Sequence, residues 1–181
     1  MKVLPTPLEG VLVIEPDVFG DERGFFMESF NRRQFTEQAG ISLEFVQDNH
    51  SRSARNVLRG LHYQRLQPQG KLVRVVSGAV FDVVVDLRRS SITFGHWHGV
   101  ELSAANRRMV WVPPGFAHGF LVVSDSADFL YKTTGYYAPQ HQRSLLWNDP
   151  RIGIRWPLSD APILSDNDRD ARPLATADVF T

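Results

Sequence analysis

The chain contains no cysteine and no long hydrophobic run, and it carries no net charge. Without cysteine, disulfide scaffolds, zinc–thiolate sites, iron–sulfur clusters and cysteine nucleophiles are excluded. No apolar stretch approaches the roughly 20 residues of a membrane-spanning helix. The balance of 20 Lys and Arg against 20 Asp and Glu argues against binding nucleic acid or an anionic membrane through bulk charge. A local basic site for one phosphorylated ligand stays open.

The remaining composition is that of a folded protein. The 181 residues suit one domain, and 43% of them are hydrophobic, which is enough for a substantial core. The first residues lack the apolar stretch that is typical of a signal peptide. We therefore expect a soluble, cytoplasmic protein with one domain over residues 1–181.

Short runs rich in aromatic and β-branched residues dominate the chain and predict strands. They cover residues 11–14, 25–30, 45–49, 71–76, 79–87, 109–112, 120–123 and 129–134. Ser77-Gly78 between two of them predicts a tight hairpin, and only 32–39, followed by Gly40, predicts a helix. This spacing is typical of an all-β sandwich, jelly roll or barrel. From about residue 150, prolines predict an extended segment packed on the barrel.

The run 57–64 contains the most suggestive pair of side chains, Arg59 and His62. A regular strand would place them on opposite faces, but Gly60 between them is typical of a bulge that re-aims side chains. By alternation, Lys71 shares a face with Val73 and Val75, so it is either an inward charge or a lysine that extends outward from the strand end. A lone histidine in such a run is also typical of a purely structural role.

Three other segments carry polar groups that a core does not require. In 19–30, Arg23 offers a planar donor fork to phosphate, while Glu28 would share a strand face with phenylalanines. Residues 47–49 (Gln-Asp-Asn) either cap a strand end or line a pocket with hydrogen-bonding groups. Tyr131 aligns with Phe129 and is either a core residue or a proton donor to a substrate. For residues 19–30, a charged turn that leads into a core strand is as well supported as a ligand-binding role of Arg23.

Two histidines on one predicted strand, His96 and His98, mimic a metal site with Glu101 nearby. Glu101 is an odd number of residues from both, so a regular strand points it to the other face. A structural role for the pair is therefore favoured over metal binding.

The segment 113–118, Pro-Pro-Gly-Phe-Ala-His, resembles the second motif of the cupins, which are small jelly-roll barrels. The place of the first cupin motif is then His62-Tyr63-Gln64, where Gln64 stands in place of the second histidine ligand. The resemblance therefore implies a metal-free cupin.

Six motifs in one order make the resemblance specific. They are Phe-Gly-Asp-Glu-Arg-Gly-Phe-Phe (19–26), Phe-Val-Gln-Asp-Asn-His-Ser (45–51), Asn-Val-Leu-Arg-Gly-Leu-His-Tyr-Gln (56–64), Gln-Gly-Lys-Leu-Val-Arg-Val (69–75), Pro-Pro-Gly-Phe-Ala-His-Gly-Phe (113–120) and Phe-Leu-Tyr-Lys-Thr-Thr (129–134). Over about residues 8–173 the chain resembles the dTDP-4-dehydrorhamnose 3,5-epimerase family.

The resemblance implies a cofactor-free jelly-roll homodimer of the dTDP-L-rhamnose pathway, acting on a dTDP-linked 4-keto-6-deoxyhexose. His62 would be the base that removes the protons at C3 and C5, and Asp168 would orient it. Lys71 would stabilise the enolate, and Tyr131 would return a proton from the opposite face. The residues that the resemblance implies in substrate binding are Phe19, Arg23, Glu28, Gln47, Asp48, Asn49, Arg59, Lys71, His118, Tyr137, Gln142 and Asn167. Tyr137 would stack on thymine.

Two positions depart from the family pattern. Relatives often have an acidic residue at Gln142 and a lysine at Asn167, which puts substrate affinity in question more than reaction type. The alternatives to the epimerase are a single-site epimerase or ketoisomerase, a non-catalytic nucleotide-sugar-binding cupin, and a metal-dependent oxygenase that uses His96 and His98. We expect residues 11–14 to form an unprotected edge strand that pairs with a partner's sheet.

Overall fold

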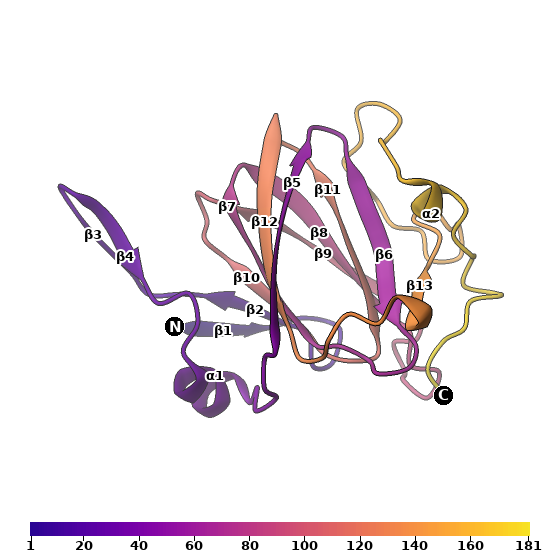
Figure 1. The fold of residues 1–181 in the computed structure, drawn as a ribbon, viewed down its shortest axis with the longest axis horizontal. Coiled ribbons are helices and arrows are strands. Elements are labelled where there is room, and N and C mark those ends of the chain that lie inside the picture. Colours follow the sequence, from indigo (N-terminus) through magenta and orange to yellow (C-terminus); the bar gives the residue numbers. More distant parts are fainter.

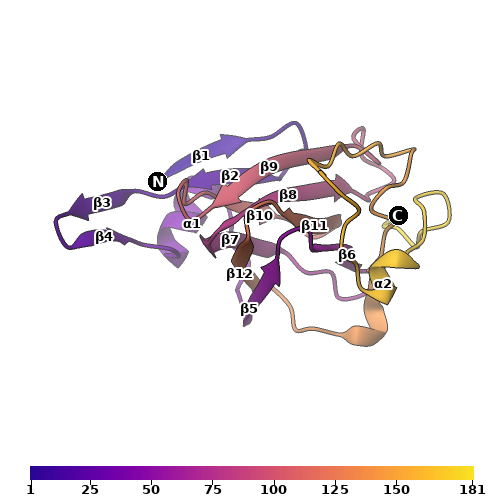
Figure 2. The ribbon, with the colours of Figure 1, turned by 90° about the horizontal axis from the view of Figure 1, so that it is seen from above.

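The strands form two antiparallel sheets that lie face to face (Figures 1 and 2). The computed structural model describes residues 1–181. In spatial order, the larger sheet consists of β1 (Lys2–Pro5), β2 (Leu12–Glu15), β10 (Met109–Val112), β7 (Lys71–Ser77), β12 (Ser126–Thr133) and β5 (Gln47–Ala54). The smaller sheet consists of β13 (Gln142–Ser144), β6 (Leu58–Gln64), β11 (Phe116–Val122), β8 (Ala79–Asp86) and β9 (Trp97–Ser103).

Alternate residues of both sheets fill the layer between them. Val73 of β7 and Phe129 of β12 come from the larger sheet, and Val80 and Val84 of β8 meet them from the smaller one. Each is almost completely buried, as the period of two in a half-buried strand requires. This architecture confirms the predicted all-β jelly roll.

Helix α1 (Arg32–Ala39) covers part of the outer face of the larger sheet. The Asn31 side chain accepts a hydrogen bond from the Gln34 backbone N–H at its start, and Gly40 ends it with φ 68°. Its buried Phe35 packs in one cluster with Met109 and Trp111. The predicted helix is confirmed.

The C-terminal segment covers the outer face of the smaller sheet (Figure 2). Ile152, Leu174 and Val179 pack against Leu61 and Val83. The segment from residue 150 contains no strand of its own, but it does include the short helix α2 (Asp166–Arg169). Both α-helices are far too short to cross a lipid bilayer.

A two-stranded hairpin, β3 (Val18–Asp21) and β4 (Gly24–Met27), projects away from both sheets (Figure 1). Phe19, Phe25 and Phe26 are 65%, 57% and 66% exposed on it. The predicted strand 25–30 was too long, because β4 ends at Met27. Glu28 does not share a strand face with phenylalanines. It accepts hydrogen bonds from Asn31 and Gln34 at the start of α1 instead.

Two predictions about strand pairing were wrong. Ser77-Gly78 does not close a hairpin, since β7 and β8 pair with other strands and belong to different sheets. The apolar faces of β7 and β8 are buried in the same core from opposite sides. Ser77-Gly78 therefore connects one sheet to the other. Residues 11–14 are not an edge either, because β2 pairs with β1 on one side and with β10 on the other.

Candidate active site

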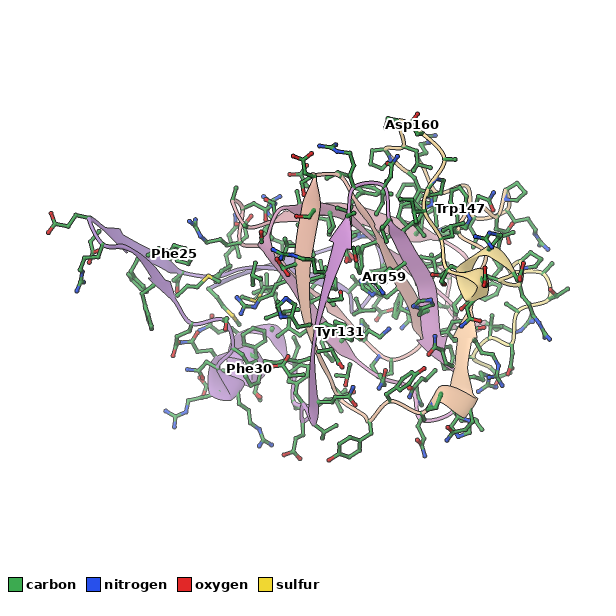
Figure 3. The ribbon with its side chains drawn as sticks, turned by 45° about the horizontal axis from the view of Figure 1, so that its top comes forward. Phe25, Phe30, Arg59, Tyr131, Trp147 and Asp160 are labelled. Atoms are coloured by element: carbon green, nitrogen blue, oxygen red, sulfur yellow. The ribbon has the colours of Figure 1, made fainter.

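A cavity of about 280 Å³ opens between the two sheets, where β5 and β12 of the larger sheet approach β6 of the smaller one. Figure 3 shows Arg59 and Tyr131 in the middle of the body, whereas Phe25 lies far away on the hairpin. Seven of the predicted site residues line this cavity: Arg59, His62, Lys71, His118, Tyr131, Tyr137 and Gln142. They come from six separate segments of the chain, so only the tertiary fold brings them together.

His62 and Asp168 form a hydrogen-bonded pair at one wall of the cavity. The His62 Nε2 lies 2.5 Å from Asp168 Oδ1, although the two residues are 106 positions apart. Since a carboxylate only accepts, Nε2 carries the hydrogen and Nδ1 is left as a proton acceptor. Asp168 itself is 2% exposed and also accepts from the Ser165 hydroxyl at 2.8 Å.

The charge of Asp168 is stabilised by these donors. Burial on its own would raise the pKa of the Asp168 carboxyl. The hydrogen bond and positive charge of His62, together with the Ser165 hydroxyl and the Gly60 N–H, outweigh burial and hold the pKa below its usual value. Asp168 is therefore a carboxylate that fixes the His62 ring and supports its protonated form.

Gly60 explains how Arg59 and His62 reach the same cavity. The pairing of β6 with β11 shifts register between His62 and Arg59. Gly60 has φ 119°, and a Cβ there would lie 2.7 Å from the Gly119 Cα, so only glycine fits this bulge. The predicted re-aiming of the two side chains is confirmed.

Lys71 enters the cavity from the first residue of β7, on the inward face with Val73 and Val75. Its Nζ lies 3.5 Å from the His62 backbone carbonyl oxygen, so the ammonium approaches the strand that carries the proton acceptor. Burial lowers the pKa of Lys71 to about 8, and the negative charge of Asp82 limits that decrease. A cation held inside the protein in this way is suited to stabilising negative charge on a ligand.

Tyr131 lies on β12, on the inward face with the buried Phe129. The two rings are 6.2 Å apart, and Phe129 stacks on Phe120 at 4.2 Å. Burial raises the pKa of the Tyr131 hydroxyl, and the Arg59 charge opposes that increase. The phenol therefore keeps its proton at neutral pH and is available as a donor.

A second histidine–carboxylate pair lies deeper in the same wall. His118 Nε2 is 2.8 Å from Asp82 Oδ2, and Asp82 is completely buried. The other carboxyl oxygen, Oδ1, is also buried and has no hydrogen-bond partner. Asp82 is thus an internal negative charge between His118 and Lys71.

A wider cavity of about 430 Å³ adjoins the first one and shares Tyr137 and Gln142 with it. Asn167, Arg143 and Arg172 also line it. Gln142 and Asn167, the two departures from the family pattern, therefore both line this outer part of the site; Gln142 also borders the His62 cavity, and Asn167 directly precedes Asp168 in α2.

The three polar residues 47–49 differ in where they point. On β5 the Gln47 and Asn49 side chains lie on one face and the exposed Asp48 on the other, where it pairs with Lys132 at 2.8 Å. Gln47 Nε2 donates to Asn49 Oδ1, and its Oε1 accepts from the Tyr137 N–H. The Asn49 Nδ2 is buried without a partner in the protein, and Asn49 does not line the His62 cavity.

One chain does not bring Phe19, Arg23 or Glu28 to the His62 cavity. Phe19 and Glu28 line a separate cavity of about 200 Å³ beside α1. The Arg23 side chain is 86% exposed at the tip of the hairpin and pairs only with Asp21, at 2.5 Å. These predicted substrate contacts cannot be made within a single copy of the chain.

The predicted metal alternative has no support in the arrangement of side chains. His98 lies on β9 and His96 just before it, but neither belongs to a group of three metal-binding side chains close enough to share an ion. Burial lowers the pKa of His98, with Asp82 opposing the change.

The sequence interpretation missed several residues that line or support the cavity. Ser51 lines it and lies two residues beyond Asn49, so the alternation of β5 was a usable signal. Ser53 accepts a hydrogen bond from Arg59 Nε at 2.9 Å. For Asp82 and Phe120 the sequence carried no signal, because they look like ordinary strand residues until the sheets are packed.

Comparisons with known proteins agree on one family. A family model described as dTDP-4-dehydrorhamnose 3,5-epimerase matches residues 5–176. A curated protein of that name from Pseudomonas aeruginosa is 59% identical over 180 residues, covering 99% of both chains.

Solved structures of similar proteins have the same fold. A 3,5-epimerase from Legionella pneumophila, crystallised with dTDP-4-keto-L-rhamnose, has a TM-score of 0.97 and 49% identity, covering 99% of this chain and 97% of its own. A 3'-monoepimerase from Streptomyces bikiniensis, crystallised with dTDP-quinovose, has a TM-score of 0.91 and 38% identity, covering 96% and 88%.

Proposed function

The chain belongs to the dTDP-4-dehydrorhamnose 3,5-epimerase family, and from that membership we propose that it inverts C3 and C5 of dTDP-4-dehydro-6-deoxy-D-glucose. The product is dTDP-4-dehydro-L-rhamnose. One observation carries the proposal most directly. The His62–Asp168 pair reaches the cavity from the smaller sheet, whereas Tyr131 and Lys71 reach it from the larger one. A sugar ring between the sheets would meet a base and an acid on different sides.

Proton removal is the first step at each carbon. His62 Nδ1 takes the proton of C3 or C5, and the C–H electron pair moves into the bond to C4 while the C4 oxygen becomes negative. Asp168 stabilises the imidazolium that forms, through the hydrogen bond to Nε2. The Lys71 ammonium stabilises the enolate oxygen, and the burial that lowers its pKa also strengthens that attraction.

Proton return then completes the inversion. The Tyr131 hydroxyl delivers its proton to the carbon from the other side, and the electron pair returns from the enolate to form the new C–H bond. Solvent afterwards reprotonates the phenolate and accepts the proton from His62. Atoms and charge balance without a redox partner, which agrees with the cofactor-free chemistry that the resemblance implies.

The nucleotide part fits the outer cavity. Tyr137 is 57% exposed and borders both cavities, so thymine stacked on its ring would leave the sugar near His62. Arg59, held by Ser53, offers its guanidinium to the diphosphate. Gln142 and Asn167 then contact the ligand as neutral groups. Both absence of a cofactor and a cytoplasmic location stay predictions.

We propose a homodimer in which the hairpin of one copy completes the cavity of the other. Phe19, Phe25, Phe26 and Arg23 remain exposed on an arm that projects from the sheets, although the Arg107 guanidinium lies over the Phe25 ring at 4.3 Å (Figure 1). Apolar surface of this kind is typical of an interface. A partner's Arg23 would bring a second guanidinium to the diphosphate near Arg59.

Mixing two inactive variants tests this arrangement. In a mixed dimer of His62→Ala and Arg23→Glu subunits, one site would combine an intact His62 with the intact Arg23 of the other copy. Mixing should therefore restore activity that neither variant shows alone. No restoration, in a sample that sedimentation shows to be dimeric, would contradict the exchange of hairpins.

The reaction itself is tested by proton NMR of the purified protein with dTDP-4-dehydro-6-deoxy-D-glucose in deuterated water. We expect exchange at both C3 and C5, followed by the L-rhamno product. Exchange at C3 alone would favour the single-site alternative. The Streptomyces bikiniensis 3'-monoepimerase, whose fold is similar to that of this chain, is an epimerase of that kind. No exchange at either carbon would leave only a binding function.

A further inference from the structure

Side-chain amides hold the backbone of the loop Gly135–Ala138, which follows β12 and carries Tyr137. Gln69 Nε2 donates to the Gly135 carbonyl at 2.6 Å, and Gln64 Nε2 donates to the Tyr136 carbonyl at 3.4 Å. The Tyr137 N–H donates to Gln47 Oε1 at 3.0 Å, and the Ala138 N–H donates to Gln64 Oε1 at 2.8 Å. Every residue of the loop is therefore bound by a glutamine. We call Gln47, Gln64 and Gln69 the amide clasp.

The amide clasp fixes the backbone of this loop, although the side chains of Tyr136 and Tyr137 are exposed. Tyr136 is 70% exposed and Tyr137 57% exposed, whereas Ala138 is buried beneath them. A surface loop ordinarily satisfies its backbone groups with water, without help from side-chain amides. Three glutamines directed at one loop indicate that the position of the exposed rings matters.

Gln64 is the centre of the clasp. It is 5% exposed and lies on β6 two residues after His62, so the same strand carries the proton acceptor and fixes the loop. Its Nε2 also donates to the Gln67 carbonyl at 2.9 Å, in the turn between β6 and β7. Both the Nε2 and the Oε1 of Gln64 are thus hydrogen-bonded to backbone groups of the protein, and neither atom is left to bind a ligand.

We propose that Gln64 is a positioning residue for nucleotide binding, which acts by fixing the Tyr137 ring as the wall on which the base of the substrate stacks. The proposal rests on the proposed function, because it takes the ligand to be a dTDP-sugar. Stacking of one base on an aromatic side chain corresponds to roughly 5- to 150-fold in affinity. Gln64 does not touch the ligand, so its effect must pass through Tyr137.

The test uses dTDP as the probe and Gln64→Met as the variant. Methionine keeps the length and volume of glutamine but makes none of its three hydrogen bonds. Calorimetric titration should show dTDP binding weakened about tenfold. KM for the sugar nucleotide should rise by the same factor, while kcat changes less than about twofold, since His62, Lys71 and Tyr131 are untouched. Gln140→Met, an exposed glutamine on the short helix η1 (Pro139–His141), is the control and should bind dTDP as the wild type does.

A double-mutant cycle with Tyr137→Ala separates positioning from a general structural effect. Once Tyr137 is removed, Gln64→Met should weaken dTDP binding less than about twofold further. An undiminished effect in that background, or wild-type affinity of Gln64→Met, would overturn the proposal. If Gln64→Met does not fold, Gln69→Met at the edge of the loop must show the same dependence on Tyr137, and its failure to do so overturns the proposal equally. A wild-type protein that does not bind dTDP would refute the proposed function and this inference with it.

Discussion

Replacing Lys71 with methionine should stabilise the protein and remove its activity. Burial lowers the pKa of Lys71 from 10.5 to about 8, after the attraction of Asp82 is included. Each pKa unit corresponds to about 1.4 kcal/mol, so keeping the ammonium charged in the folded protein costs about 3 kcal/mol near pH 7. Water that enters the cavity reduces this cost, which makes about 3 kcal/mol the upper value for the gain in unfolding free energy of Lys71→Met.

The pH dependence of that gain follows from the two pKa values. Between about pH 8 and pH 10.5 the unfolded chain binds the lysine proton and the folded protein does not. The unfolding free energy of the wild type therefore rises with pH in this interval. Lys71→Met has no such group, so its advantage should be largest near pH 7 and disappear above about pH 10.5.

The catalytic loss should be large at the same time. Removing one donor from a developing oxyanion typically lowers kcat by about 10²- to 10³-fold. Lys71 is the only cationic side chain that the larger sheet contributes to the lining of the cavity. For the wild type, activity should fall as pH rises through about 8, where Lys71 loses its proton.

Guanidinium unfolding at several pH values and NMR exchange in deuterated water measure the two effects. Lys2→Met, on the exposed edge strand β1, is the matched control and should change neither. A Lys71→Met protein that is less stable than the wild type at pH 7, or that keeps wild-type exchange, would refute the reasoning.

The remaining predictions concern the other groups of the site and the expected independence of metal. His62→Ala should abolish exchange at both carbons while dTDP still binds in calorimetry; exchange at the wild-type rate would end its role as the base. Tyr131→Phe keeps the ring but not the transferable proton, so NMR should show net inversion falling much further than deuterium exchange; an equal loss of both would place Tyr131 in proton removal. Asp168→Asn should lower kcat by about three to four orders of magnitude, because an amide can donate to Nε2 and favour the wrong tautomer. Since the folded pKa of Asp168 lies below its unfolded value, its contribution to stability is present near neutrality and is lost on acidification, so acid unfolding of the Asn variant should depend less on pH. Activity should survive exhaustive chelation, and restoration only by an added metal would contradict that expectation.

The sequence alone determined the features that depend on neighbouring residues. Alternation along a strand placed Lys71 on the inward face with Val73, and Tyr131 on the inward face with Phe129. A glycine in the middle of a strand marked the bulge that turns Arg59 and His62 to one cavity. The Asn31 and Gly40 ends of α1 follow from cap chemistry within one turn. Each of these rests on contacts among residues close in the chain, which a pattern records.

Only the tertiary structure decided which distant segments meet. Ser77-Gly78 has the composition of a hairpin turn, yet the strands on either side join different sheets because both bury their apolar faces in one core. From sequence, Asp168 was assigned through the family resemblance, and Asp82 was not singled out at all. Their partners lie 106 and 36 residues away, and strand packing sets those contacts. The exposure of Arg23 and of the hairpin phenylalanines is a further result of the tertiary structure, because the hairpin projects away from both sheets.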